Sequence, residues 1–502
     1  MKQKKKAIAL AALLIMAFLV FATVMLFYDK NTQVSPTPTA IPSLAPTPTP
    51  TPASKLAGLY SYIMSVSGSN YQILNSAGFV IESSTSSSIA FNYLLGSSGV
   101  ASSGNSVYVE SGAYAVSVTW NIYVNNVTVT FQSGAVLTAV NNFNSEVMWI
   151  YGHNVIISGV TINGNGLNQS PSAKRLLTGA NFNDGVIFQG ANDLIEYSTV
   201  YNVRTFGITT PYETACSNLG VVNCTVYDCG ANGIMAGDPT VTDAYFINNV
   251  VYSCGDVGID SYGTNTIITG NYVHDCGGGA SPAPPMYGYN NGGWGIGIED
   301  GAGSGNGSYV FIAGNTIVDC GQGIYVGGNY PTINYVLISG NTVTNQYDGG
   351  YGGSIVLDGS SYSIIEFNTI NSAASLGINI GYGGGFPSSD DIGNTVYGNT
   401  YNKCPTHFIN DGTGTITITP SIVAITVTSS PTGVGFVMAN GMDGYGGLYS
   451  TSPYIFYDTV GNLVTLEATP PPGYTFISWS DGGAQSHTIT VPSYDVTYTA
   501  TY

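Results

Sequence analysis

The chain has 502 residues, enough for two or three domains, and only 8% of its residues are charged. Because 44% of the residues are hydrophobic and the apolar positions recur periodically, the composition excludes a disordered protein. Beyond residue 30 lie 27 of the 28 Asp and Glu but only five of the 10 Lys and Arg. A surface that acidic repels nucleic acid and anionic lipid, so we expect no nucleic-acid partner and favour cations or neutral ligands.

The N-terminus combines positive charge with a long apolar run. KQKKK precedes an apolar stretch from residue 7 to residue 28, and 22 residues at 1.5 Å rise extend about 33 Å, enough to cross a bilayer. Positive charge before the run places its N-terminal end in the cytoplasm. Residues 1–30 are therefore predicted to be a cytoplasmic tip and a transmembrane signal anchor of a single-pass cell-membrane protein. Cleavage as a signal peptide, followed by secretion, is the alternative.

A Pro/Thr-rich segment follows the predicted anchor. Within residues 31–55, the sequence SPTPTAIPSLAPTPTPTPAS has proline at alternate positions over much of its length. Such a composition favours an extended, semi-rigid stalk. We expect it to lift the next domain away from the membrane.

One phrase recurs from residue 222 to residue 401: an apolar stretch, Gly-Asn, a second apolar stretch, often Cys-Gly, and then Gly-Ile. VNCTVYDCGANGI and AGNTIVDCGQGI are two copies. A period near 22 residues with insertions is typical of stacked units, here of three short strands each. We expect the repeated Asn to form tight corners, with left-handed backbone and amides bonded to the Asn above and below. The aligned positions are Cys224, Asn249, Asn271, Asn315, Asn341, Asn368 and Asn399.

Four of the seven cysteines recur at one place in the repeat, namely Cys229, Cys254, Cys276 and Cys320. This register predicts a buried column of small apolar side chains. Metal binding by these cysteines is the functional alternative, but neither CxxC pairs nor clustered histidines support it. Disulfides between neighbours in the column remain open.

These residues resemble the right-handed parallel β-helix superfamily of pectate lyases and polygalacturonases. Residues 104–139 are similar to the first coils of those enzymes, and HNVIISGVTINGNG (153–166) is similar to an early coil. The resemblance, which covers roughly residues 85–415, implies an all-β solenoid, and we assign residues 56–415 to it. It does not imply one activity, since the same coil serves lyases, hydrolases, epimerases and inert adhesins.

Residues 421–502 alternate with period two and read as turn-rich strands. The WSDG stretch, residues 479–482, resembles a small β-sandwich-like repeat module of prokaryotic surface proteins. Trp479 and His487 could touch sugar, but a core Trp and a surface His are the preferred interpretation. The resemblance implies a spacer or an attachment unit.

The residue after each Gly-Ile should point out of the coil, because side chains alternate along a strand. The outward column so predicted contains Asp260 and Glu299 on adjacent coils, about 4.8 Å apart. Two carboxylates that close must share a proton or a cation. We therefore predict either a Ca²⁺ site, with Asp300 as a further ligand, or the catalytic acids of a retaining glycosidase. The full predicted column is Thr209, Met235, Asp260, Glu299, Tyr325 and Asn379.

Aromatic residues surround the predicted carboxylate pair. The insertion at 277–295 carries Tyr287, Tyr289 and Trp294, whose ring faces could stack on sugars. Tyr252 and His274 belong to a second outward column on the preceding strand, together with Tyr201 and Tyr227. Ordinary surface packing is the alternative for both groups.

The motifs of the resembled enzymes are incomplete. The polygalacturonase set of paired Asp, Gly-His-Gly and Arg-Ile-Lys is missing. Lyase chemistry, which the resemblance implies, needs a basic residue, and Arg204 is a distant candidate. FGITTPYE (206–213) resembles an epimerase coil only at Pro211 and Glu213.

The sequence therefore predicts a surface-anchored protein that binds an extracellular polysaccharide, with cleavage of that polysaccharide as a candidate second activity. Asp260, Glu299 and Arg204 are the candidate catalytic residues. A non-catalytic surface or adhesion protein is the alternative, supported by the scarcity of basic residues and the missing catalytic sets.

Overall fold

The computed structural model describes residues 56, 58–169, 183–211, 214–277, 293–300, 307–328, 333–346, 352–381, 391–418, 422–430, 436–440, 450–451, 454–459, 463–470, 474–492 and 496–502. The predicted anchor and stalk therefore lie outside the described residues. Within the described part, no helix is long and apolar enough to cross a membrane. The first compact unit ends at Ile416 and the second runs from Thr417 to Tyr502.

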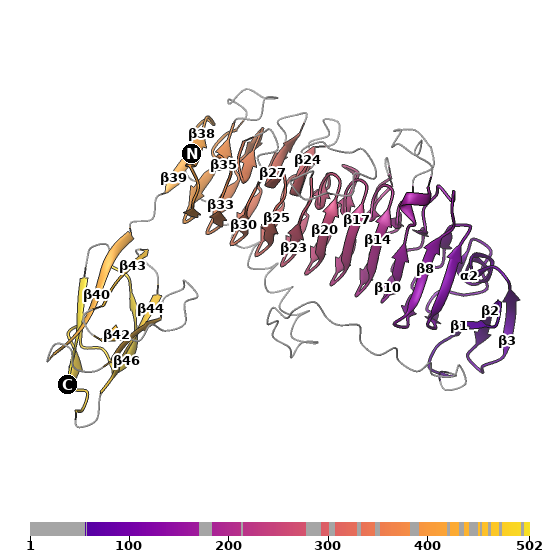
Figure 1. The fold of residues 1–502 in the computed structure, drawn as a ribbon, viewed down its shortest axis with the longest axis horizontal. Coiled ribbons are helices and arrows are strands. Elements are labelled where there is room, and N and C mark those ends of the chain that lie inside the picture. The colour runs from indigo at the N-terminus through magenta and orange to yellow at the C-terminus, as the bar shows by residue number, and fades with distance from the viewer. Residues whose placement is uncertain are drawn as a thin grey trace, which may run out of the picture. The chain divides into compact units, whose positions relative to one another are not determined.

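The first unit is a solenoid in which the chain visits three sheets in turn, so that each strand pairs with its equivalent one coil later (Figure 1). In the described residues these sheets hold 15, 11 and 11 strands. Pairing between coils is parallel throughout all three sheets. The predicted parallel β-helix with three strands per repeat is thus confirmed.

The strands of the first sheet are β1 (Tyr62–Ser67), β2 (Asn70–Asn75), β3 (Val80–Ser84), β4 (Ser106–Val109), β7 (Thr128–Phe131), β10 (Ile156–Ser158), β13 (Leu194–Glu196), β16 (Gly220–Val222), β19 (Tyr245–Ile247), β22 (Ile267–Thr269), β25 (Phe311–Ala313), β29 (Leu337–Ser339), β33 (Ile364–Glu366), β36 (Thr395–Tyr397) and β39 (Ile416–Ile418). Those of the second sheet are β5 (Gly112–Val116), β8 (Ala135–Ala139), β11 (Thr161–Asn163), β14 (Thr199–Val203), β17 (Thr225–Cys229), β20 (Val250–Cys254), β23 (Tyr272–His274), β26 (Thr316–Val318), β30 (Thr342–Thr344), β34 (Thr369–Asn371) and β37 (Thr400–Asn402). Those of the third sheet are β6 (Trp120–Ile122), β9 (Met148–Ile150), β12 (Val186–Phe188), β15 (Ile208–Thr209), β18 (Ile234–Ala236), β21 (Ile259–Ser261), β24 (Trp294–Asp300), β27 (Gln322–Gly328), β31 (Ile355–Leu357), β35 (Leu376–Ile380) and β38 (Thr406–Asn410). The short elements β28 (Ile333–Asn334), β32 (Ser360–Ser361) and the 3₁₀ turn η2 (Gly166–Asn168) lie outside these three sheets.

The N-terminal end of the coil is closed by elements that the sequence did not predict. Strands β1 to β3 form an antiparallel extension of the first sheet, and helix α2 (Ser87–Leu95) follows them (Figure 1). The Ser86 side chain caps the helix by accepting from the Ile89 N–H. Phe91 of the helix stacks on Trp120 of β6 at 4.0 Å. The helix therefore covers apolar side chains at the start of the coil.

The predicted asparagine ladder is present at the corner between the first and second sheets. Each buried Asn oxygen accepts from the main-chain N–H and the amide of the Asn one coil earlier, as Asn315 does for Asn271 at 2.9 Å in both bonds. Because buried amide groups are costly without partners, the ladder stabilises each corner. The left-handed residue, however, is the one before the ladder position, for example Asn248 and Gly314. The ladder residues themselves are absent from the left-handed set, which corrects the prediction.

The cysteine column is also confirmed. Cys229 and Cys254 are Cα partners in the second sheet, and all seven cysteines are buried free thiols. Burial raises the pKa of Cys254, Cys276 and Cys320 well above the ordinary value. These thiols therefore pack as small core side chains.

In the part of the second unit that the structure describes, two four-stranded sheets enclose a core of their own. Trp479 is buried in this core and its indole N–H donates to the Gln485 carbonyl at 3.1 Å. The preferred interpretation of a core Trp is thus correct. The strands are β40 (Ile422–Ser430), β43 (Tyr454–Thr459), β45 (Ser478–Trp479) and β47 (Val496–Thr501) in one sheet, and β41 (Phe436–Asn440), β42 (Ser450–Thr451), β44 (Leu463–Thr469) and β46 (Ser486–Thr490) in the other.

Candidate functional site

The outward column of the third sheet was predicted correctly at most positions but not at Glu299. The Cα partner of Asp260 is Gly297, because Ile259 pairs with Ile296 rather than with Ile298. The sequence GIGIED contains two overlapping Gly-Ile pairs, and the second was taken for the repeat. Glu299 therefore lies one coil along and two residues further on, about 8 Å from Asp260 between Cα atoms rather than about 4.8 Å.

Asp260 is not the water-facing carboxylate that was expected. It is only 1% exposed, and its Oδ2 accepts a hydrogen bond of 2.8 Å from the Asn232 amide. The side chain does lie on the outer side of the sheet, since a Cβ built on Gly297 would be 3.0 Å from Asp260 Oδ1. Asp260 is thus a buried carboxyl that accepts a hydrogen bond from Asn232, and it is not one exposed member of a carboxylate pair.

Two glycines in the third sheet make room for aromatic rings on its outer face. A Cβ on Gly297 would meet the Trp294 ring at 2.9 Å, and one on Gly327 would meet the Tyr325 hydroxyl at 2.5 Å. The Trp294 and Tyr325 rings stack at 4.1 Å with 17° between their planes. Trp294, predicted to sit in a loop, is in fact the first residue of β24, so the β-helix itself holds this pair in place.

Asp358 is the acid that sequence reasoning missed. It is 2% exposed, the Tyr325 hydroxyl donates to its Oδ2 at 3.4 Å, and its Oδ1 has no hydrogen-bond partner. Burial raises the pKa of the Asp358 carboxyl, against a lowering by the Tyr325 hydrogen bond. A signal existed: Asp358 follows Ile355 by three residues, as Glu299 follows Ile296. It was overlooked because the strand SIVLD does not begin with Gly-Ile.

Glu299 is half-buried and accepts a hydrogen bond from the Tyr262 hydroxyl at 2.8 Å. Glu299 pairs with Gly327 in the ladder, and Asp358 follows one coil later. Their Cα atoms are therefore two ladder steps, about 10 Å, apart. The carboxyls of inverting glycosidases lie roughly 6.5–9.5 Å apart and those of retaining ones roughly 5 Å, so two acids whose Cα atoms stand two ladder steps apart suit the wider spacing better.

We call this group of side chains the acid–aromatic face. Trp294, Glu299 and Tyr262 are its partly exposed members, while the others are buried. Its residues are Asp260, Tyr262, Trp294, Glu299, Tyr325 and Asp358.

The described residues do not fit the predicted calcium site. Asp260 and Glu299 stand in different rows of the face, and the side chain of Asp300 is not described. Among the residues that the structure describes, no three His, Cys, Asp or Glu side chains come together as a metal site requires. No step of the chemistry below is therefore assigned to Ca²⁺.

The second predicted column is a ladder of parallel rings on the second sheet. Successive centroids of Tyr201, Tyr227, Tyr252 and His274 lie 5.0, 4.8 and 4.8 Å apart, with interplanar angles of 8° or less. The rings stack on one another, so the faces between them are not open to a sugar. Tyr252 and His274 can therefore offer a ligand mainly ring edges and polar atoms rather than open ring faces.

The remaining predicted residues lie away from this face or outside the described chain. Arg204 follows β14, on the coil of Thr209, which is two ladder steps before Asp260. Its side chain is 9% exposed, and its main-chain N–H donates to Asn183 Oδ1 at 3.0 Å. Tyr287 and Tyr289 are outside the described residues.

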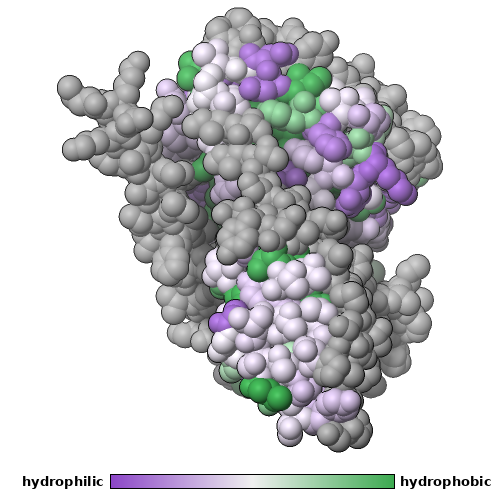
Figure 2. Space-filling view, turned by 90° about the vertical axis from the view of Figure 1, so that its left-hand side faces the viewer, coloured by the Kyte–Doolittle hydropathy of each residue, from purple (hydrophilic) through white to green (hydrophobic). Residues whose placement is uncertain are grey.

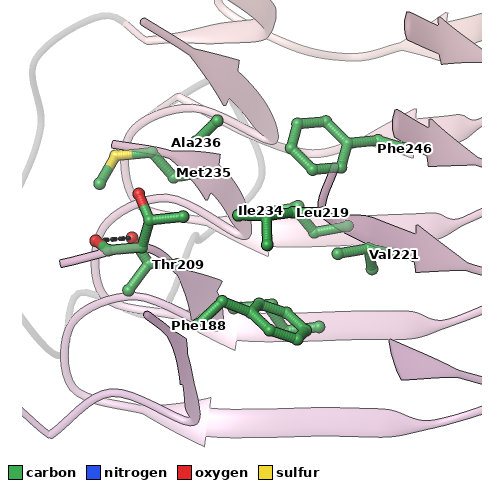
Figure 3. A pocket seen from close by; sticks show the side chains of 10 residues that line it. Phe188, Thr209, Leu219, Val221, Ile234, Met235, Ala236 and Phe246 are labelled. Carbon is green, nitrogen blue, oxygen red and sulfur yellow. Dashed lines mark hydrogen bonds between the residues drawn. The ribbon is translucent and has the colours of Figure 1, made fainter. Parts of the chain in front are cut away.

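A small apolar cavity lies between the first and third sheets, near Phe188, Leu219 and Phe246 (Figure 3). It has about 10 Å³ of free space, room for one water at most. Because core side chains such as Ile208, Val221 and Ile234 line it, it is a packing defect and not a ligand site.

Figure 2 shows one face of the molecule, on which weakly polar residues predominate. Hydrophobic and strongly hydrophilic residues occur there only in small patches. This agrees with the 8% of charged residues and the abundance of Gly and Tyr.

Comparison with known proteins supports the fold. Residues 212–325 match the model of a right handed beta helix region, and residues 444–502 match that of a divergent InlB B-repeat domain. The parallel sheets and the first match together make the coil a right-handed parallel β-helix. The second match is to that repeat alone, so the predicted WSDG-type module is not confirmed. No curated protein matches the chain significantly.

Several solved structures are similar to this chain. The A-module of the Azotobacter vinelandii mannuronan C-5 epimerase AlgE6 is 18% identical, over 63% of this chain and 91% of its own, with a TM-score of 0.40. The Agl-KA catalytic domain is 16% identical over 66% and 64%, with a TM-score of 0.46. The Streptococcus pneumoniae surface protein and adhesin PfbA is 15% identical over 61% and 91%, with a TM-score of 0.41. At these values the likenesses carry no argument about activity.

Proposed function

We propose that this protein is exported, is anchored to the cell membrane by residues 1–30, and binds an extracellular polysaccharide on the acid–aromatic face. The observation that carries the proposal is the stacked pair Trp294–Tyr325 beside Glu299. An aromatic ring held rigidly on a strand presents C–H-binding surface at little entropic cost, and a neighbouring carboxylate accepts from sugar hydroxyls.

Binding of a polysaccharide panel to the full-length chain tests this proposal. We expect Trp294→Ala to weaken binding at least tenfold, because it removes the exposed ring of the pair. Tyr309→Asn is a matched control: it removes a stacked ring from the first sheet, where Asn265 already holds the equivalent left-handed position. Failure of every polysaccharide to bind would end the proposal. Repeating the binding measurements in the presence of EDTA shows whether binding of the polysaccharide requires Ca²⁺.

The cleavage that the geometry supports best is hydrolysis with inversion. Asp358, whose pKa is raised by burial, would give its proton to the leaving oxygen as the glycosidic C–O bond breaks. Glu299 would take a proton from the water whose oxygen bonds to the anomeric carbon. New reducing ends should then appear and should be lost in Glu299→Gln and in Asp358→Asn.

Glu366→Gln is the control for cleavage, because Glu366 is also a half-buried carboxyl with a raised pKa and a tyrosine partner, Tyr397, but lies on the first sheet. Binding without any product would favour the alternative, a non-catalytic adhesion protein. The rings of the second sheet stack on one another, and this favours the alternative, because their faces then contribute to the packing of the β-helix and are not available to a ligand.

A further inference from the structure

The acid–aromatic face lies in a long part of the chain without positive charge. No Lys or Arg occurs anywhere between Arg204 and Lys403, whereas Asp and Glu recur throughout that stretch. A ligand at this face therefore meets the Glu299 carboxylate, and the same stretch of chain supplies no basic side chain to neutralise that charge. A glycan that carries carboxylates or sulfates would be repelled there.

Gln322 adds an uncharged polar group to the same face. It is the Cα partner of Trp294, and Asn232 occupies the same position two coils before Trp294 and three before Gln322. Both of those side chains lie over the outer side of the third sheet, Trp294 above Gly297 and Asn232 bonded to Asp260. The position of Gln322, three residues before Tyr325 in β27, thus directs its side chain over the outer side of the same sheet.

Gln322 and Asp358 are buried with hydrogen-bonding atoms that nothing satisfies. Gln322 is 0% exposed and neither its amide nitrogen nor its amide oxygen has a partner; Asp358 Oδ1 has none either. Groups of this kind are costly in a folded protein unless a ligand completes them. An amide and a carboxyl together offer donors and acceptors, which matches sugar hydroxyls, because each hydroxyl both donates and accepts.

We infer that the acid–aromatic face selects an uncharged glycan, that Gln322 and Asp358 bind its hydroxyls, and that polyuronates and other anionic glycans are excluded. This inference rests on the proposed function and names its substrate class. First contact with the ligand belongs to Trp294 and Glu299, the members that reach solvent.

A matched pair of polymers tests the charge selection: a uronate homopolymer, and the same polymer after its carboxylates have been reduced to primary alcohols. We expect the full-length chain to bind the reduced polymer at least tenfold more tightly at low ionic strength. Salt should leave binding of the reduced polymer unchanged, since no ion pair forms. Tighter binding of the uronate polymer, with or without added Ca²⁺, would overturn the inference and leave the proposed function standing. Binding of no glycan at all would remove both.

Gln322→Leu tests the role of the buried amide. We expect at least tenfold weaker binding of the neutral polymer and an unchanged or higher melting temperature, since an apolar side chain removes two unsatisfied groups. If Gln322 had a purely structural role, its substitution would not weaken binding while leaving the melting temperature unchanged or higher. Gln346→Leu is the matched control, because Gln346 is likewise buried with an unpartnered amide oxygen but follows β30 of the second sheet. Wild-type affinity in Gln322→Leu would contradict the assignment, and Asp358→Asn provides the second variant should Gln322→Leu fail to fold.

Discussion

At the scale of single residues, Asp193 shows that burial can turn a carboxyl into a pH-dependent group far from the acid–aromatic face. Its Oδ1 accepts from the Val155 N–H at 2.8 Å, while its Oδ2 has no partner. A Cβ built on Gly190 would lie 2.2 Å from this Oδ2 and 1.9 Å from the Gly152 carbonyl oxygen. Two acceptors thus converge there, and burial raises the pKa of Asp193 to about 7.

The folded state therefore holds a proton on Asp193 that the unfolded state releases near pH 4. Between about pH 4 and pH 7 the folded state binds more protons, so this group's contribution makes stability fall as pH rises. We predict that Asp193→Asn, whose amide can donate to the Gly152 carbonyl, is more stable than wild type at pH 8. The gain is at most about 4 kcal/mol and disappears toward pH 4.

Urea denaturation of both proteins between pH 4.5 and pH 8 measures this difference. Asp411→Asn, at an exposed position, controls for the simple loss of a negative charge. Parallel stability curves for wild type and Asp193→Asn would show that the Asp193 carboxyl does not titrate in this range.

At the scale of elements, the asparagine ladder should account for a large part of the stability of each corner. Asn315 donates to the Ile268 carbonyl and accepts from both the main chain and the amide of Asn271. We predict that Asn315→Ala costs about 3 kcal/mol, because all three groups stay buried and lose their partner. Asn402→Ala should cost well under about 1 kcal/mol, since the bond from Asn402 to Asn371 is exposed and water can replace it. Equal losses in the two variants, measured by chemical denaturation, would contradict this account.

The same elements show how far the sequence leads. Strand positions, the Asn corner and the cysteine column follow from periodicity, because each repeat presents the same side chains to the core. Periodicity cannot choose between Ile296 and Ile298 as the partner of Ile259, since a shift of two residues keeps every side chain on its own face. The observed register places Gly297, which has no side chain, beside Asp260 and under the Trp294 ring.

The parts of the site that were missed depend on three-dimensional packing. Glu299 was identified as a candidate, but its neighbours Tyr262 and Asp358 come from other coils, and the strand of Asp358 carries no Gly-Ile signature. The N-terminal helix α2 was missed because it covers the end of the coil once and belongs to no repeat. Sequence alone therefore found the sheet that carries the site and two of its acids, Asp260 and Glu299, but not Asp358 or the hydrogen-bonded arrangement.

At the scale of the whole molecule, each of the two compact units has a main core of its own among the described residues. The apolar cluster of the coil ends at Cys404, and the cluster of the second unit begins at Ile425. We predict two unfolding transitions in calorimetry. Trp479→Ala should lower only the transition of the second unit and Trp120→Ala only that of the coil, each by the equivalent of about 3–5 kcal/mol, because each Trp is fully buried in one core. The two substitutions control for each other, and a variant that shifted both transitions together would show that the cores unfold as one cooperative structure.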